Sequence, residues 1–182
     1  MKIRPTFWIF VALLIIADES HFLLCSLPAI FVHEIGHFVA ILISKCKIVG
    51  ISLSGIGAEI EIDNASNPYY LDILIYISGP IFSIIFSILS SCLGWYTMSG
   101  ISLVLGLFNL LPISMLDGGK VLNSIFKIFL DINLADKICF IVSIVLSFII
   151  LLFGIYVMIF TRYNFTLVLL GLYFTYSSCR NA

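Results

Sequence analysis

Residues 31–37 read Phe31-Val-His-Glu-Ile-Gly-His37 and lie inside an apolar run that extends from residue 20 to residue 43. A run of this length can form a transmembrane helix, which needs about 20 predominantly apolar residues. Ionisable side chains in the hydrocarbon layer cost several kcal/mol, so those that occur there usually face a polar interior and serve a function. The stretch therefore predicts a membrane helix with a functional centre inside it.

The composition of the whole chain also indicates a membrane protein. The 182 residues are 62% hydrophobic and 10% charged, whereas soluble domains have about 45–50% apolar and about 25% charged residues. So few charged side chains cannot cover the surface of a soluble domain of this length. The net charge of -1, without a strongly basic stretch, gives no indication of nucleic-acid binding. The five scattered cysteines form no CxxC pair, and we interpret them as small apolar packing residues.

Apolar runs between the charged residues predict an all-α polytopic protein with about six transmembrane helices. The first run could also belong to a signal peptide, but Ile15 stands where a small residue should precede a cleavage after Ala17, which favours a retained span. We expect residues 1–182 to form a single transmembrane domain. The predicted spans are residues 5–17, 20–43, 71–93, 99–116, 138–160 and 163–178.

The positions of lysine and arginine predict the orientation of these spans, because translocation of short basic loops is disfavoured. With six spans and a cytoplasmic N-terminus, Arg162 alone among the nine basic residues lies outside. Both termini are then cytoplasmic, and His33 and His37 lie in the cytoplasmic half of the second span. The basic residues expected inside are Lys2, Arg4, Lys45, Lys47, Lys120, Lys127, Lys137 and Arg180.

Residues 44–70, between the second and third spans, are too polar and too rich in glycine for a membrane helix. Apolar residues alternate with smaller or charged ones from Ile51 to Ile62, and Gly55 and Gly57 interrupt the pattern. This period is typical of two strands joined by a glycine bend. We therefore predict a short β-hairpin insertion, whose simplest interpretation is a cytoplasmic connection between spans.

The histidines and the glutamate of the second span have the spacing of a metal site. His33 and His37 share one helical face, so two imidazole nitrogens can lie about 2.0–2.1 Å from one zinc ion, with Glu34 beside them as a base. A lone buried histidine is often only hydrogen-bonded within a core, but two histidines and a glutamate at this spacing argue against that interpretation. His21 lacks such spacing, and we interpret it as an interfacial residue.

Asp117 is the candidate third ligand, because a catalytic zinc usually has three protein ligands and one open position. In the predicted topology it lies at the cytoplasmic end of the fourth span, at a depth comparable with that of the histidines. Pro112 interrupts the backbone ladder and Gly118-Gly119 permit a tight path, so an irregular segment can direct Asp117 at a metal. Taken alone, Asp-Gly-Gly would indicate only a loop.

Three motifs in order resemble site-2 proteases, the zinc intramembrane metalloproteases. The likeness covers about residues 26 to 125 and is greatest to the compact sporulation branch, which cleaves a sigma-factor precursor. The motifs are His33-Glu-Ile-Gly-His37, Ser78-Gly-Pro80, and Asn109-Leu-Leu-Pro112 followed by Leu116-Asp-Gly-Gly119.

Two positions depart from the family pattern. Ser83 stands where asparagine is often found, and Lys120 where arginine is common. We expect neither residue to touch the proposed ligands. We also expect no nucleotide-sensing CBS domain and no PDZ insertion within this chain.

The resemblance implies a metalloendopeptidase that hydrolyses a peptide bond in or near a transmembrane segment of a membrane-bound substrate, as in regulated intramembrane proteolysis. His33, His37 and Asp117 would hold one Zn²⁺ per chain, and Glu34 would be the catalytic base. Asn109 is a candidate contact to the oxyanion or the substrate, or alternatively an amide that packs between helices. The third span's glycine and proline are expected to permit close helix packing and a kink.

The resemblance also implies a role for the hairpin. Gly55, Ile56, Gly57 and Ala58 would pair with the unwound substrate as an added strand. The expected partners are a membrane-protein or membrane-anchored peptide substrate, the lipid bilayer and an unidentified regulatory partner, but not nucleic acid. The expected location is a bacterial cell membrane, with the active site in its cytoplasmic half.

Two other functions stay open. A small metal-ion or solute transporter could use the same histidine and aspartate ligands, although it needs polar residues along a whole path, and here they concentrate in the predicted cytoplasmic half. A catalytically silent membrane binding partner is the second alternative. The complete set of His33, Glu34, His37 and Asp117 argues against it.

Overall fold

The structure, a computed structural model, describes residues 2–3, 22–44, 48–54, 57–62, 68–161 and 165–180. Side chains are described for residues 26–44, 68–161 and 165–179. The first predicted span, residues 5–17, lies outside the described residues. The chain divides into two compact units, Met1–Phe108 and Asn109–Ala182.

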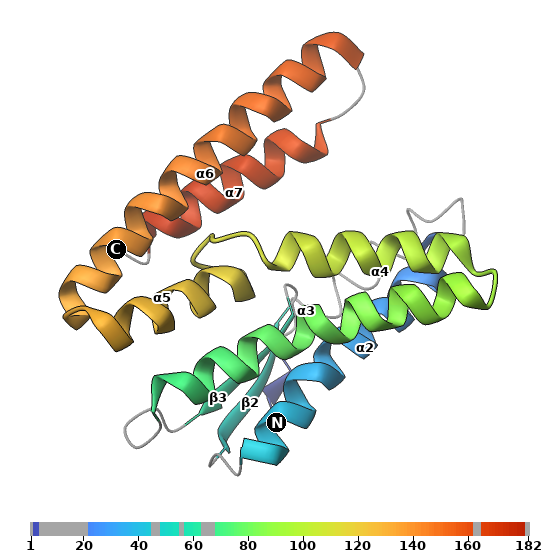
Figure 1. The fold of residues 1–182 in the computed structure, drawn as a ribbon. Coiled ribbons are helices and arrows are strands. Elements are labelled where there is room, and N and C mark those ends of the chain that lie inside the picture. The colour runs from blue at the N-terminus through green and yellow to red at the C-terminus, as the bar shows by residue number, and fades with distance from the viewer. Residues whose placement is uncertain are drawn as a thin grey trace. The chain divides into compact units, whose positions relative to one another are not determined.

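Helices α2 (Phe22–Ser44), α3 (Tyr69–Cys92) and α4 (Tyr96–Asn109) make up most of the first unit (Figure 1). Helices α2 and α3 approach closely, because a Cβ on Gly36 would lie only 2.7 Å from the carbonyl oxygen of Ser78. The turn from α3 to α4 includes Gly94 with φ 80, a conformation that glycine adopts without strain. Ser87 Oγ then donates to the carbonyl oxygen of Ser99 at 2.8 Å and joins α3 to α4.

A small sheet belongs to the same unit. Strands β1 (Lys2–Ile3), β2 (Ile48–Ser54) and β3 (Gly57–Ile62) lie in the order β1-β2-β3. Strands β2 and β3 are antiparallel, with Ser54 opposite Gly57, and β1 pairs parallel with β2. The antiparallel pair lies in the region where the alternating pattern predicts a hairpin.

The second unit contains α5 (Asp117–Phe129), α6 (Ile132–Thr161) and α7 (Thr166–Arg180). Lys127 Nζ lies 2.8 Å from Asp136 Oδ1 and ties α5 to α6 near their short connection. Helices α6 and α7 form an antiparallel pair that packs through glycine (Figure 1). A Cβ on Gly154 would lie 2.8 Å from the carbonyl carbon of Leu167.

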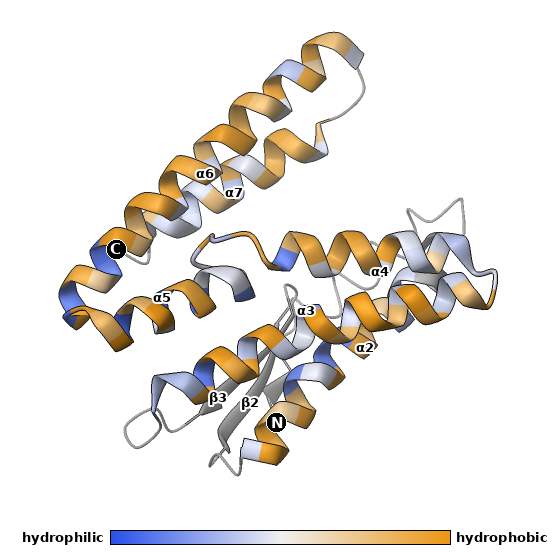
Figure 2. Cartoon of the chain, viewed as in Figure 1, coloured by the Kyte–Doolittle hydropathy of each residue, from blue (hydrophilic) through white to orange (hydrophobic). Residues whose placement is uncertain are grey.

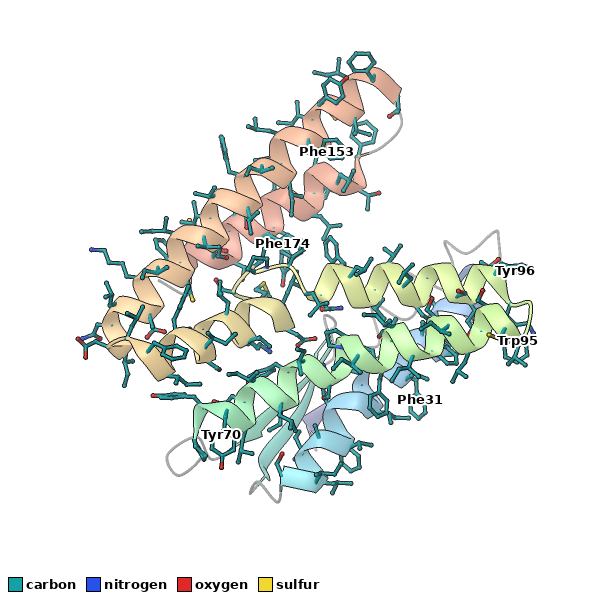
Figure 3. The ribbon with its side chains drawn as sticks, in the orientation of Figure 1. Phe31, Tyr70, Trp95, Tyr96, Phe153 and Phe174 are labelled. Atoms are coloured by element: carbon teal, nitrogen blue, oxygen red, sulfur yellow. The ribbon has the colours of Figure 1, made fainter. Side chains whose placement is uncertain are left out.

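The helices have the length and surface of a membrane protein. Residues Ser26–Ser44 of α2, together with α3 and α6, are three helices long and apolar enough to cross a membrane. Figure 2 shows α3, α4 and α6 as largely hydrophobic. Phe153 on α6 is 57% exposed, whereas Phe174 on α7 is 4% exposed (Figure 3). Exposed apolar surface of this extent indicates contact with lipid. The chain is therefore a membrane protein, and the count of six spans stays a prediction.

The fourth predicted span, residues 99–116, is helical up to Asn109, and the irregular segment expected around Pro112 follows it. Helix α4 has 14 residues and ends at Asn109, so it is about 21 Å long, shorter than the hydrocarbon layer of about 30 Å. Pro112 lacks a backbone N–H, and its ring clashes with a preceding carbonyl, which favours an interruption of the helix at this point. Helix α5 then begins at Asp117. Helix α5 is not expected from the sequence, because Lys120 and Lys127 resemble the charged residues of loops between spans.

Candidate metal centre

His33 and His37 lie one turn apart on α2, as their spacing predicts. Both side chains are buried, with exposed fractions of 5% and 8%. Glu34 follows His33 on the same helix, and its side chain is half-buried. Helix α2 therefore holds two potential ligands and a potential base within five residues.

The Nδ1 atom of each imidazole has a partner on α3. His37 Nδ1 lies 2.8 Å from the carbonyl oxygen of Ile75, and His33 Nδ1 lies 2.9 Å from Ser83 Oγ. A carbonyl oxygen can only accept, so His37 Nδ1 carries the proton, and in the neutral ring the lone pair is on Nε2. Histidines that bind metals usually donate their other nitrogen in this way.

The two Nε2 atoms lie 3.3 Å apart, and the ring planes are inclined at 81°. Two nitrogens that each bind a tetrahedral zinc ion at about 2.0–2.1 Å are separated by about 3.3–3.4 Å. The histidine pair therefore has the spacing of two ligands of one metal ion. Its buried position and the orientation of both rings by α3 add to that fit.

Ser83 corrects one expectation from the sequence. We expected it not to touch the proposed ligands, but its hydroxyl is hydrogen-bonded to His33 and the residue is fully buried. Gly79 and Ser83 are four residues apart, so both lie on one face of α3. The sequence alone gives no signal that singles out Ser83 for this contact with a residue of another helix.

Asp117 is the first residue of α5, and its side chain is 8% exposed. The residue before it, Leu116, is extended with φ -89 and ψ 161. A Cβ on Gly118 would overlap the carbonyl oxygen of Leu110, and one on Gly119 would overlap that of Ile113. The double glycine thus lets the start of α5 lie directly against the preceding irregular segment, as the sequence predicts.

The remaining predicted site residues are those expected to contact the oxyanion or the substrate. Asn109 is the last residue of α4 and is half-buried. Gly57 and Ala58 begin β3, opposite Ser54 and Leu53 of β2. The other two residues predicted to pair with substrate, at positions 55 and 56, lie outside the described residues.

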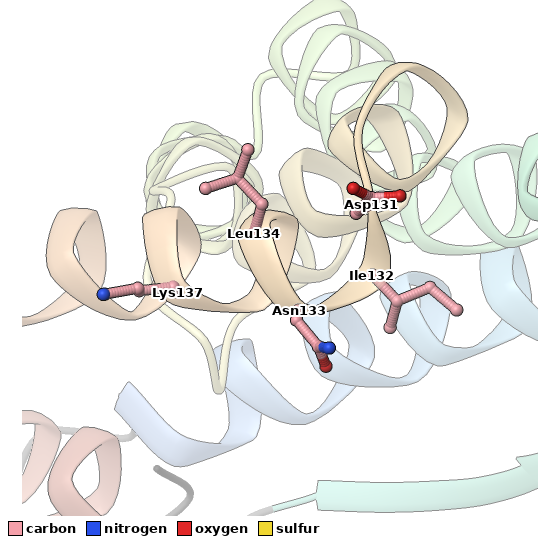
Figure 4. A pocket seen from close by; sticks show the side chains of 5 residues that line it. All are labelled: Asp131, Ile132, Asn133, Leu134 and Lys137. Atoms are coloured by element: carbon pink, nitrogen blue, oxygen red, sulfur yellow. The ribbon is translucent and has the colours of Figure 1, made fainter.

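A pocket of about 560 Å³ opens where α5 meets α6 (Figure 4). Its side chains include one acid, one lysine and one amide, but none of the predicted ligands and no histidine or cysteine. It is therefore not part of the candidate metal centre. The lining residues are Asp131, Ile132, Asn133, Leu134 and Lys137.

Known proteins resemble this chain in sequence and in fold. The family profile described as Peptidase family M50 matches residues 91–153, a range that includes Asp117. Stage IV sporulation protein FB of Bacillus subtilis is 27% identical over 158 residues, which cover 77% of this chain and 54% of the relative. The chain thus spans about half the length of this curated relative.

A solved structure agrees with both sequence matches. The Site-2 Protease from Methanocaldococcus jannaschii superposes with a TM-score of 0.72 and 26% sequence identity, over 98% of this chain and 88% of that chain. Similarity therefore extends over almost all of the present sequence, including the helix with the histidine pair. The peptidase profile, the sporulation relative and this common fold together support a member of the site-2 protease family.

Proposed function

We propose that the protein is a zinc-dependent intramembrane endopeptidase that cleaves a peptide bond in or near a transmembrane segment of a membrane-bound substrate. The observation that carries this proposal is the separation of 3.3 Å between the Nε2 atoms of His33 and His37. The similarity to site-2 proteases in sequence and in fold supports it independently. The separation supports a metal site, and the similarity supports its use in peptide hydrolysis.

We propose His33, His37 and Asp117 as the ligands of one Zn²⁺ per chain. Each offers one ligand atom, and two imidazole nitrogens with one carboxylate oxygen form a donor set that suits zinc. Three protein ligands leave a coordination position open for water. A bound zinc ion would lower the pKa of its water toward about 7 and would polarise the scissile carbonyl.

Glu34 is the proposed catalytic base. Its carboxylate accepts a proton from the attacking water and then donates that proton to the nitrogen of the leaving amine. Glu34 directly follows His33 in the sequence of α2, so the proposed base is bonded to a residue that is a proposed ligand. Asn109 is the proposed donor to the oxyanion, through its side-chain amide.

Strand β3 is the proposed docking strand for the substrate. Strand β2 is paired on both sides, by β1 and by β3, so β3 is an outer strand of the described sheet. An extended substrate segment can add to such a strand through backbone hydrogen bonds, which do not require a particular sequence. Gly57 and Ala58 at its start belong to the stretch for which the family resemblance implies pairing with substrate.

The distribution of lysine and arginine supports cytoplasmic termini and a metal centre in the cytoplasmic half of a bacterial cell membrane. The substrate class is then a membrane protein, or a membrane-anchored peptide, whose cleavage site comes within reach of that side. A regulatory partner would control access to the site. Such a substrate must unwind locally, because a transmembrane helix keeps its peptide bonds in internal hydrogen bonds.

The test compares membrane proteomes of cells that carry the wild-type protein or the Glu34→Gln variant. We expect a membrane protein to accumulate uncut in the variant, while the purified variant keeps about one zinc ion per chain. The matched control is Asp131→Asn, an equivalent change at an exposed position between α5 and α6. It should leave cleavage unchanged. Full cleavage by the Glu34→Gln variant would overturn the proposed mechanism.

A second variant tests the ligand set. Asp117→Asn should strongly lower the zinc content of the purified protein, because an amide oxygen is a much weaker zinc ligand than a carboxylate. Zinc content equal to that of the wild type would show that the third ligand is another residue. This result would leave the assignment of His33 and His37 intact.

A further inference from the structure

The segment that precedes Asp117 has few backbone hydrogen bonds of its own. Between the end of α4 and the start of α5, Ile113 N donates to the carbonyl oxygen of Leu111 and Leu116 N donates to that of Ile113, both at 2.8 Å. Pro112 has no N–H to offer. The N–H of Ser114, in contrast, donates to a side chain on another helix, Ser143 Oγ of α6, at 3.0 Å.

Ser143 is itself held by a second serine. Its Oγ lies 2.7 Å from Ser178 Oγ on α7, and the exposed fractions of the two residues are 0% and 1%. A hydroxyl oxygen can accept the Ser114 N–H and also share a second hydrogen bond with another hydroxyl. A row of three groups therefore connects α7, α6 and the segment before Asp117, in surroundings where each lost hydrogen bond is costly.

Close backbone packing couples the position of residues 110–116 to that of Asp117. Gly118 and Gly119 lie against the carbonyl groups of Leu110 and Ile113, with no room for a side chain on either glycine. Ile113 is fully buried. The start of α5 cannot shift without the segment, so a group that fixes Ser114 also fixes the carboxylate three residues later.

We infer that Ser143, supported by Ser178, is a positioning residue that fixes Asp117 through the backbone of Ser114. The inference rests on the proposed role of Asp117 as a metal ligand. It assigns a function to α6 and α7, which contribute none of the proposed ligands. Loss of either hydroxyl should loosen the segment and thereby weaken metal binding.

The test uses the full chain in detergent and compares Ser143→Ala with Ser147→Ala. Ser147 lies one turn further along α6, is equally buried, and its hydroxyl has no hydrogen-bond partner within the described residues. The two variants thus remove the same atom from the same helix, but only one removes the bond to Ser114. We expect Ser143→Ala to weaken zinc affinity about tenfold or more, as loss of a group that orients a ligand typically does, and Ser147→Ala to leave it unchanged.

Hydrogen exchange in the metal-free protein gives a readout that does not depend on the metal. Backbone amides of residues 110–116 should exchange faster in Ser143→Ala than in the wild type or Ser147→Ala. Equal zinc affinity and equal exchange in both variants would overturn the inference. If Asp117→Asn binds zinc normally but Ser143→Ala still speeds exchange, then the proposed ligand set fails, whereas the connection through Ser143 holds.

The Ser178→Ala variant provides a second test, which can be used if the Ser143→Ala protein does not fold. It keeps the hydroxyl that Ser114 needs and removes only the support behind it, so we expect a smaller loss of zinc affinity in the same direction. Ser178→Ala with wild-type affinity and wild-type exchange would contradict the proposed support from α7.

Discussion

The α-carbon of Gly79 faces the imidazole of His37 so closely that a Cβ at this position would overlap the Nε2 atom of the ring. Helix α3 thus has no room for a side chain at the position that faces this proposed ligand of α2. Gly79 is expected from the sequence to permit close helix packing, and its packing partner is the side chain of His37 itself. Gly79 is buried, as is Pro80 after it.

The first prediction concerns this contact. Gly79→Ala should push the His37 imidazole out of place and lower zinc affinity about tenfold or more. The control is Gly100→Ala on α4, where a Cβ would meet nothing within 4 Å. That change should keep zinc affinity and add slightly to helix stability. Chelator competition with both purified variants measures the difference, and wild-type affinity in Gly79→Ala would contradict the described packing.

The second prediction concerns the bond between His33 and Ser83. Ser83→Ala removes the group that orients the ring, so zinc affinity should fall by about 10–100-fold. Ser102→Ala is the matched control, because Ser102 is equally buried and its hydroxyl has no hydrogen-bond partner in the described part of the chain. Similar zinc affinities in the two variants would show that Ser83 does not orient His33.

The third prediction concerns the start of α5. Gly118→Ala would place a methyl group against the backbone carbonyl of Leu110, which cannot move aside as a flexible side chain can. Overpacking of this kind costs about 1–3 kcal/mol. We expect a lower midpoint of thermal unfolding and a lower zinc content in the same variant. An unchanged midpoint would mean that the segment before Asp117 adapts freely.

The fourth prediction is that acidification releases the metal. The Nδ1 proton of His37 is already held by the carbonyl of Ile75, so an added proton must occupy Nε2, the nitrogen that binds the metal. Proton and metal therefore compete directly, and affinity falls as the pH falls. The loss follows from the protons that must leave the ligand nitrogens before the metal can bind. Zinc titrations over a pH series measure this loss, and an affinity independent of pH would exclude the histidines as ligands.

Local features of this fold could be predicted from the sequence. His33 and His37 share a helix face because four residues make about one turn, and this rule needs no knowledge of tertiary contacts. The interruption before Asp117 was also visible, because Pro112 and the double glycine restrict the backbone wherever they occur.

Contacts between distant segments could not be predicted in this way. The bond from His33 to Ser83 joins residues 50 positions apart, and the bond from Ser114 to Ser143 joins positions 29 apart. Nothing in a single sequence distinguishes these serines from others that only fill space between helices. Helix α5 was missed for a different reason, since its charged residues resemble the boundaries of a membrane span.

The two histidines differ in how their orientation is encoded. His33 depends on the side chain of residue 83, so a single codon change can remove its partner. His37 depends on a main-chain oxygen at residue 75, which every amino acid at that position would supply. One ligand is therefore open to adjustment by point mutation, whereas the other is protected from it as long as the helix persists. Efforts to retune the affinity or the choice of metal should begin on the side of His33.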